Sequence, residues 1–316
     1  MEAAIWGLLG QRPVDVIDFD GFGHFWAVDV VEQLQVHGSR ILKAPPGEVP
    51  DLKITNWRHD VVLVANGTSA GTRIPDDDWI PANREGLVIC DASSAAFAMH
   101  LPWHKLDAVT WSWQKALGGE GAHGMLALSP RAVERLNTHQ PAWPIPKLLR
   151  LVEDGRFRED VFRGGSINTP SQLCVEDALD ALRWAKTVGG LPALLERTDA
   201  NYAILARWVE QTPWIAFLAK EERIRSHASV CLSVVAPWYE RLPLDGKAAS
   251  IQRMTALLAA ERVAYDIDAN PMAPPGLRIW CGPTVERDDI QALLPWLDWA
   301  YEIVSVEYEL RSLASA

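Results

Sequence analysis

Two apolar runs in the middle of the chain each end in residues that can do chemistry. The run at 87–90 stops at Asp91, and the run at 108–113 stops at Gln114 and Lys115. Short β-rich runs that close on a polar residue are typical of buried parallel strands, whose carboxyl ends carry the active sites of α/β sheets. An acid and an amine at neighbouring strand ends suit pyridoxal phosphate, because lysine forms a Schiff base with its aldehyde and aspartate pairs with its pyridinium.

Both residues also have an ordinary structural explanation. Lys115 could be a lysine that reaches from a strand end to solvent, and Asp91 before small residues could cap a helix. A lysine packed at the end of an apolar run is partly desolvated, which lowers its pKa and makes its free amine available for imine formation. From position alone both explanations stay open.

Three other side chains could contact a planar cofactor or a substrate. Trp26 lies where a loop opens a helix, although in a chain with 15 tryptophans a core position is the ordinary alternative. Thr68 follows the apolar run at 60–65 and could donate to the phenolic oxygen of the cofactor ring, or could be a plain turn residue. His123, close behind Lys115, is a candidate for substrate or phosphate contact and could equally be structural.

Two features could bind anions. Arg278 lies inside the apolar run 277–280, where a guanidinium needs a partner that either a substrate carboxylate or a structural ion pair can supply. Asn168 and Thr169 precede Pro170 in a typical helix N-terminal sequence, whose unpaired N–H groups can also bind an anion.

Composition restricts the function classes. A formal charge of −11 argues against a nucleic-acid partner, and no apolar run reaches membrane-spanning length. The four cysteines form no CxxC pair, so we expect neither a metal site nor a disulfide framework, and we expect a cytoplasmic protein. The HExxH and Walker motifs are absent, which leaves metalloprotease and NTPase functions without support.

The hydrophobic pattern predicts an α/β protein with a mixed, mostly parallel sheet and a smaller C-terminal α+β domain. We expect a large cofactor-binding domain at 1–190, followed at 191–316 by a linking helix and the small domain. Predicted strands lie at 14–19, 40–43, 60–65, 87–91, 108–113, 124–128, 230–235, 263–267 and 277–280. Predicted helices lie at 2–9, 25–36, 130–136, from 169 to about 188, 192–210, 247–262 and 286–303.

Several longer stretches together resemble one known family. They are ICDASSAAFA (89–98), SWQK with GGE (112–120), AHGM (122–125), LSPRAVERL (128–136), INTPS (167–171) and PPGLRIWCG (274–282). With them the chain resembles the phosphoserine aminotransferases, class V aminotransferases of fold type I that use pyridoxal phosphate, and most of all their proteobacterial form. The resemblance extends from the first helix to about residue 304 and implies a seven-stranded type of sheet flanked by helices.

The resemblance also implies roles in cofactor binding. Lys115 would form the Schiff base with the cofactor, and after release would carry the proton between the substrate Cα and the cofactor C4′. Asp91 would pair with the pyridinium, and Trp26 would stack on the ring. Thr68 would contact the ring oxygen, and Gln114 would lie near the cofactor phosphate.

Substrates and a partner follow from the same resemblance. Arg278 would hold the amino acid α-carboxylate, while Asn168 and Thr169 would reach the cofactor phosphate of the neighbouring subunit in a homodimer. The implied reaction transfers an amino group between L-glutamate and 3-phosphohydroxypyruvate, giving 2-oxoglutarate and O-phospho-L-serine in serine biosynthesis. Some relatives also act in pyridoxine synthesis.

The chain departs from the family pattern at its start. Family members carry a segment before the first helix, with a His-Arg pair for the distal group of the substrate and a turn that binds the cofactor phosphate. We therefore expect a truncated chain that binds the cofactor weakly and transaminates poorly. Alternatives are another class V enzyme, such as an alanine–glyoxylate aminotransferase, or a silent remnant that only dimerises. A cysteine desulfurase is disfavoured because no cysteine lies in a Gly/Ser-rich loop.

Overall fold

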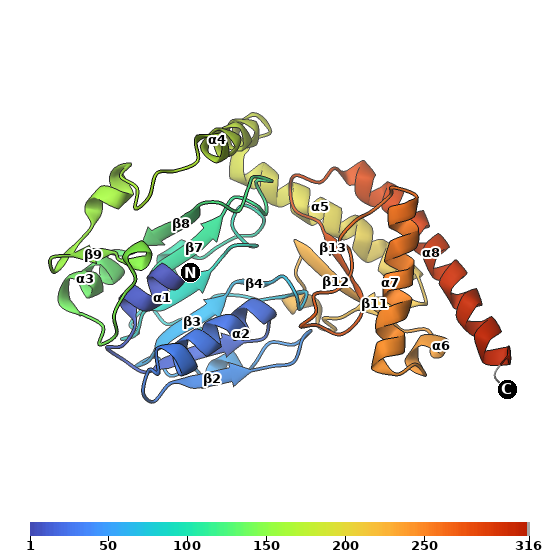
Figure 1. The fold of residues 1–316 in the computed structure, drawn as a ribbon, viewed down its shortest axis with the longest axis horizontal. Coiled ribbons are helices and arrows are strands. Elements are labelled where there is room, and N and C mark those ends of the chain that lie inside the picture. The colour runs from blue at the N-terminus through green and yellow to red at the C-terminus, as the bar shows by residue number, and fades with distance from the viewer. Residues whose placement is uncertain (315–316) are drawn as a thin grey trace.

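A six-stranded sheet forms the N-terminal half of the molecule in the computed structural model, which describes residues 1–314 and the side chains of residues 1–310 (Figure 1). Its strands are β1 (Val14–Asp18), β2 (Arg40–Lys43), β3 (Asp60–Val64), β6 (Val88–Asp91), β7 (Ala108–Ser112) and β8 (Gly124–Leu128). They are ordered β2-β1-β3-β6-β7-β8; the first five are parallel and β8 is antiparallel to β7. The mixed, mostly parallel sheet is confirmed, but the expected count of seven is not. Within the described residues no strand pairs with the outer edge of β8.

The central strands are apolar because both of their faces are buried. Along β3, Val61 and Leu63 belong to the core on one face, whereas Val62 belongs to the core on the other. On β6, Cys90 and Ile89 divide between the two faces in the same way. Every residue of β1, β3 and β6 is buried, as the continuous hydrophobic runs predict for strands inside a parallel sheet.

Helices cover one face of this sheet, and irregular segments at 44–57, 74–80 and 92–106 cover the other. The helices are α1 (Glu2–Leu8), α2 (Gly21–Val28), which continues as a π-helical turn at Asp29–Gln33, and α3 (Pro130–Thr138). Leu8, Ala27 and Leu136 of these helices pack into one core beneath the strands. The turn after β3 contains a two-residue hairpin, β4 (Asn66–Gly67) with β5 (Thr72–Arg73).

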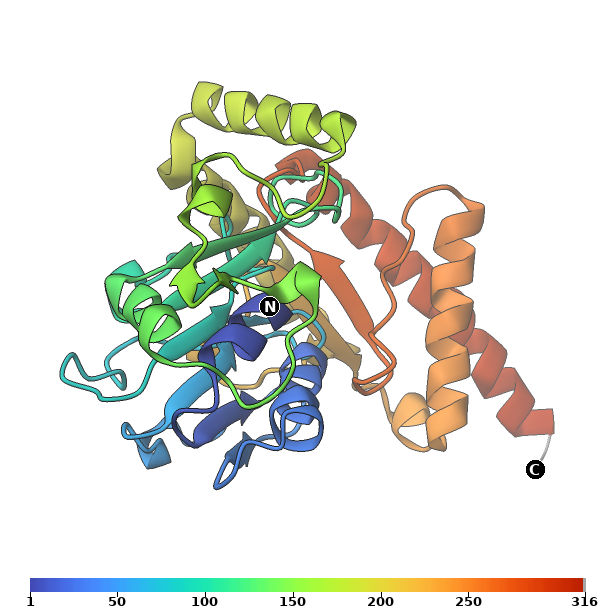
Figure 2. The same ribbon diagram turned by 60° about the vertical axis from the view of Figure 1, so that its left-hand side comes forward.

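Residues 139–171 run along the outside of the sheet with little regular structure. The segment includes the short hairpin of β9 (Val152–Glu153) and β10 (Arg156–Phe157) and two 3-10 turns, at Lys147–Leu149 and Glu159–Arg163. Helix α4 (Gln172–Thr187) then begins after Ser171, whose hydroxyl accepts a hydrogen bond from the Cys174 N–H, a little later than predicted. Both views show α4 away from the large sheet, and α5 (Gly190–Gln211) running from the end of α4 toward the second sheet (Figures 1 and 2).

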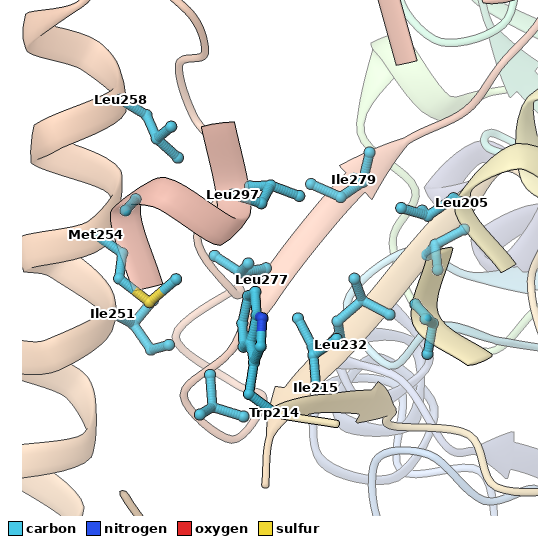
Figure 3. Packing of buried hydrophobic residues seen from close by; sticks show 14 of the residues in the cluster. Leu205, Trp214, Ile215, Leu232, Ile251, Met254, Leu258, Leu277, Ile279 and Leu297 are labelled. Carbon is cyan, nitrogen blue, oxygen red and sulfur yellow. The ribbon is translucent and has the colours of Figure 1, made fainter. Parts of the chain in front are cut away.

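A second, three-stranded antiparallel sheet forms the C-terminal part. It contains β11 (Ile215–Phe217), β12 (Ser229–Val234) and β13 (Leu277–Trp280), and the accompanying helices are α6 (Pro237–Glu240), α7 (Leu244–Ala260) and α8 (Arg287–Ala314). Figure 3 shows how Leu232 and Leu277 of the sheet face Met254 of α7 and Leu297 of α8 in one buried cluster. This core is separate from the two cores of the large sheet.

The strand predicted at 263–267 is wrong. Val263 and Ile267 pack against the C-terminal core, which explains the apolar pattern, but Arg262 and Asp266 have φ values of +59° and +54° that interrupt an extended run. The segment is a loop with a single β-bridge at Asp268. Sequence reasoning missed the three-residue strand β11. Among the described helices none has the length and hydropathy to cross a membrane.

Candidate active site

The parallel strands bring the predicted cofactor residues to one edge of the sheet. In the pairing register Asp91, the last residue of β6, lies opposite Val64 on β3 and Thr110 on β7. The turns that follow β3 and β7 carry Thr68 and Lys115 to the same edge. A cavity of about 390 Å³ lies there, and five of the nine predicted site residues line it: Trp26, Thr68, Asp91, Gln114 and Lys115.

Asp91 is the buried acid of this cavity. One carboxylate oxygen accepts a hydrogen bond from the indole N–H of Trp26 at 3.0 Å, and the other accepts from the backbone N–H of Ser93 at 2.9 Å. The second bond is the local capping contact considered from the sequence, so Asp91 both caps the turn and faces the cavity. Trp26 is partly buried at the cavity wall and not wholly in the core. Each carboxylate oxygen accepts one of these hydrogen bonds and keeps a second lone pair that can accept another.

Lys115 lies between this cavity and a second one of about 530 Å³, since it lines both together with Thr68 and Gln114. Burial lowers the pKa of the Lys115 amine, and the positive charge of Arg278 lowers it further against the opposing effect of nearby carboxylates. The amine lies 6.0 Å from the centre of the Trp280 ring. Its environment therefore favours the neutral, nucleophilic form, as the sequence predicted.

Arg278 is on β13 and lines the second cavity. Its guanidinium is 3.7 Å from the carboxylate of Asp266. Asp266 is thus the candidate for the structural ion pair that the sequence analysis considered as the alternative to a substrate carboxylate. This distance is too long for a hydrogen bond. Within the described residues no side chain accepts a hydrogen bond from the Arg278 guanidinium, so its planar donor set is available at the cavity wall.

A polar network that sequence reasoning missed fixes the turn carrying Thr68. Asp20, the N-cap of α2, accepts hydrogen bonds from the backbone N–H groups of Phe22, Ser69 and Ala70 at 2.9, 2.7 and 3.2 Å. The Ser69 hydroxyl also donates to Asp20 and accepts from the Gly21 N–H at 2.9 Å. An acidic residue directly before Gly21 at a strand end is a helix-cap pattern that could have pointed to Asp20.

The C-terminal part holds the same turn from the other side. The Ser229 hydroxyl on β12 donates to the backbone carbonyl of Thr68 at 2.8 Å. On the sheet side, the Asn66 amide donates to the Ser94 hydroxyl, which in turn donates to the Asn66 carbonyl, both at 2.9 Å. No local pattern indicated these contacts, because the partners are far apart along the chain.

Three predicted residues lie outside both cavities. Asn168 and Thr169 are exposed in the segment before α4 and line neither cavity. His123 packs its ring against Trp113, edge to face, with centroids 5.0 Å apart, and its buried Nδ1 has no hydrogen-bond partner. Gln114 lines both cavities but is exposed, and its amide oxygen accepts from the Ser112 hydroxyl.

The residues around the cavity fit pyridoxal phosphate. Each part of the cofactor would meet a suitable side chain. The buried carboxylate of Asp91 suits the pyridinium, the indole of Trp26 suits the ring face, the hydroxyl of Thr68 suits the phenolic oxygen, and the Lys115 amine of lowered pKa suits the aldehyde. No group of three or more potential metal-ligating side chains occurs in the part of the chain that the structure describes.

Solved structures show the class of this fold. A phosphoserine aminotransferase from Cytophaga hutchinsonii superposes with a TM-score of 0.75 at 17% identity, covering 94% of this chain and 79% of that one. An alanine–glyoxylate aminotransferase from Nostoc superposes with a TM-score of 0.74, also at 17% identity, over 95% of this chain and 78% of the other. The architecture is that of a fold type I aminotransferase.

Curated relatives narrow the class. No protein-family model matches the chain. Phosphoserine aminotransferase of Methanosarcina barkeri is 49% identical over 303 residues, which cover 96% of this chain and 79% of the relative; that of Methanosarcina mazei is 48% identical over the same shares. The chain belongs to the phosphoserine aminotransferase family. It is an aminotransferase that uses pyridoxal phosphate. These two relatives come from Methanosarcina and not from proteobacteria, to which the resemblance had pointed.

Proposed function

We propose that this chain catalyses amino transfer between L-glutamate and 3-phosphohydroxypyruvate, giving 2-oxoglutarate and O-phospho-L-serine for serine biosynthesis. The observation that carries the proposal is one lysine of lowered pKa between a buried carboxylate and a guanidinium whose hydrogen-bond donors are unused in the part of the chain that the structure describes. Lys115 lines one cavity with Asp91 and the adjoining cavity with Arg278. Family membership at nearly half identity supports the same substrates and disfavours both the alanine–glyoxylate alternative and the silent remnant.

The residues around the smaller cavity are proposed to hold the cofactor. Asp91 would keep the pyridine nitrogen protonated, while Trp26, oriented by its hydrogen bond to Asp91, would cover a face of the ring. Thr68 would donate to the ring oxygen, and Gln114 would lie near the phosphate. When bound, pyridoxal phosphate supplies an electron sink for the substrate Cα–H bond.

Lys115 is proposed as the residue that moves the proton. Its lowered pKa leaves a larger fraction of the amine unprotonated at a given pH than in an ordinary lysine, so more of it is available to accept a proton. Arg278 is proposed to bind the substrate α-carboxylate through two parallel N–H donors, which would place the Cα beside the amine. The contact of His123 with substrate stays a prediction, since His123 lies on Trp113 outside both cavities.

We further propose a homodimer whose sites are shared. Asn168 and Thr169 are exposed and line neither of the two cavities of their own chain, which suits residues that serve a neighbouring subunit. Next to them α4 exposes apolar side chains, including Leu173, Leu179 and Leu182. Light scattering after size exclusion would give the mass, and a mass of one chain would exclude the dimer.

Complementation tests the shared site. A Lys115→Ala chain mixed and refolded with a Thr169→Ala chain should regain part of the activity, because one site of the mixed dimer then has both residues intact. Mixing two preparations of the same variant is the control. Activity that stays at the level of the single variants would show that each chain forms its site alone.

Two experiments test the reaction itself. Borohydride reduction of the cofactor-loaded chain followed by peptide mapping should label Lys115; label on another lysine, or none, would exclude its role. Turnover should be at least tenfold faster with glutamate and phosphohydroxypyruvate than with alanine and glyoxylate. The reverse preference would assign the chain to another class V activity.

Domain organisation, location and a second pathway are also proposals. We propose a large domain at 1–190 and a linking helix with a small domain at 191–316, supported by hydrophobic cores that are separate in the large sheet and in the C-terminal part. A cytoplasmic location is supported by four cysteines that are all free and buried. A role in pyridoxine synthesis would require turnover of a phosphorylated threonine analogue, which a coupled assay can measure.

A further inference from the structure

Asp266 is an acidic residue at the substrate cavity, and its geometry is unusual. It lines the 530 Å³ cavity beside Lys115 and Arg278, yet 88% of its side chain is exposed. Its φ is +54°, a left-handed conformation that aspartate tolerates better than most residues. An acidic side chain so exposed gains nothing from burial, so its position over the cavity is set by the loop that carries it.

That loop is tied to β13 and to the residue before it by two backbone hydrogen bonds directly after Asp266. The Arg278 N–H donates to the Ile267 carbonyl at 2.7 Å, and the Ala269 N–H donates to the Gly276 carbonyl at 2.9 Å. The two bonds hold the loop along the strand from which Arg278 projects. They therefore keep the Asp266 carboxylate near the guanidinium, although no hydrogen bond joins the two side chains.

We infer that Asp266 is an affinity-determining residue: its carboxylate occupies the charge-binding position at Arg278 in the empty site, and a substrate carboxylate must displace it. The inference rests on the proposed role of Arg278 as carboxylate anchor. A contact of 3.7 Å with an exposed partner compensates the guanidinium charge without using its donors. An incoming carboxylate forms the two hydrogen bonds that Asp266 leaves unmade, and the released aspartate is stabilised by water.

The arrangement also affects Lys115. The negative charge of Asp266 raises the pKa of the Lys115 amine, opposite to the effect of Arg278, and the carboxylates of Asp20 and Asp91 act in the same direction as Asp266. Displacement of Asp266 by a substrate carboxylate replaces one negative charge by another near Arg278. A negative charge therefore offsets the effect of the Arg278 guanidinium on Lys115 both before and after substrate binds. With a neutral residue at position 266, that offset would be missing in the empty site.

Calorimetric titration of glutarate into the cofactor-loaded chain tests the inference. Glutarate has the two carboxylates of glutamate but no amino group to transfer, so binding is measured apart from turnover. Asp266→Asn keeps the backbone preference and removes the charge; it should bind glutarate about two- to fivefold tighter, the usual range for an exposed ion pair. Asp268→Asn is the matched control, because Asp268 is on the same loop and lines neither cavity; its affinity should stay at the wild-type value.

Variants at Arg278 separate the two proposals. Arg278→Leu should lose at least tenfold in glutarate affinity, and Asp266→Asn added to it should have no further effect, since the two residues then no longer compete. If Arg278→Leu binds like the wild type, the anchor role fails. If Arg278→Leu loses binding but Asp266→Asn binds no tighter than the wild type, the anchor stands and the inference about Asp266 is overturned.

Discussion

Replacing Asp20 by Asn tests whether the missed network holds the cofactor site together. One carboxylate oxygen of Asp20 accepts from the Phe22 N–H, and the other accepts from the N–H groups of Ser69 and Ala70 and from the Ser69 hydroxyl. Both oxygens therefore face backbone donors. An asparagine amide presents an NH₂ group to one of these sets in either orientation, so no flip restores the network.

The magnitude follows from the bonds that are lost. In the better orientation Asn keeps the Ser69 and Ala70 contacts and loses the N-cap bond to Phe22, which costs about 1 kcal/mol. Loss of the charge on the remaining buried bonds adds about 1–2 kcal/mol. The sum of about 2–3 kcal/mol corresponds to a fall in Tm of roughly 4–12 °C for a domain of this size.

Thermal and urea unfolding of the cofactor-free chain measure this loss, and a cofactor titration measures its effect on the site. Because Asp20 positions the turn with Thr68, cofactor affinity should fall along with stability. Asp51→Asn is the control: Asp51 caps a short exposed turn through one bond, to the Lys53 N–H at 3.0 Å, and its replacement should change Tm by less than about 2 °C. An Asp20 variant that unfolds like the control and binds the cofactor normally would refute the network argument.

Three further predictions concern charge. Arg135→Leu leaves the buried Asp60 carboxylate without its 2.9 Å partner, and urea unfolding should show a loss of about 3–5 kcal/mol. Burial raises the pKa of Asp15, but its hydrogen bonds lower this pKa overall. The stability that Asp15 contributes is therefore complete above the unfolded pKa of about 3.9 and is lost as pH falls through the lower folded pKa. The free energy of unfolding of Asp15→Asn should accordingly depend less steeply on pH in the acid range than that of the wild type. The rate at which Lys115 captures the cofactor, measured by borohydride trapping, should rise with pH, with a midpoint below the pKa of free lysine. Arg278→Leu should move this midpoint to higher pH, because the guanidinium lowers the pKa of Lys115.

The chemistry of the site could be predicted from the sequence because it follows strand ends. Hydrophobic runs that stop at Asp91 and before Lys115 give the parallel strands, and the parallel arrangement alone brings both residues to one edge. The same logic placed Thr68 after β3. Prediction failed where apolar spacing had another cause: Val263 and Ile267 contact the C-terminal core from a loop, since positive φ at Asp266 prevents the extended conformation.

What positions these residues could not be predicted, because it depends on contacts between distant segments. Asp20 and Ser69 are 49 residues apart, and Ser229 contacts Thr68 across 161 residues. A hydroxyl-bearing residue has no pattern that identifies its partner at such separation. Sequence alone therefore gave the groups that are proposed to act on the cofactor and substrate, while the groups that hold them in place required the folded chain.

Gly71 shows why the two parts of the molecule form one site. Its φ is +66°, and a Cβ at this position would lie 2.7 Å from the Cβ of Cys231 on β12. The sequence requirement for glycine thus arises from the second sheet, 160 residues away along the chain, and not only from the local turn. Together with the bond from Ser229 to Thr68, this close approach fixes the turn between the two sheets. Any movement of the C-terminal part relative to the large sheet must therefore either leave this contact intact or displace Thr68 from the cofactor cavity.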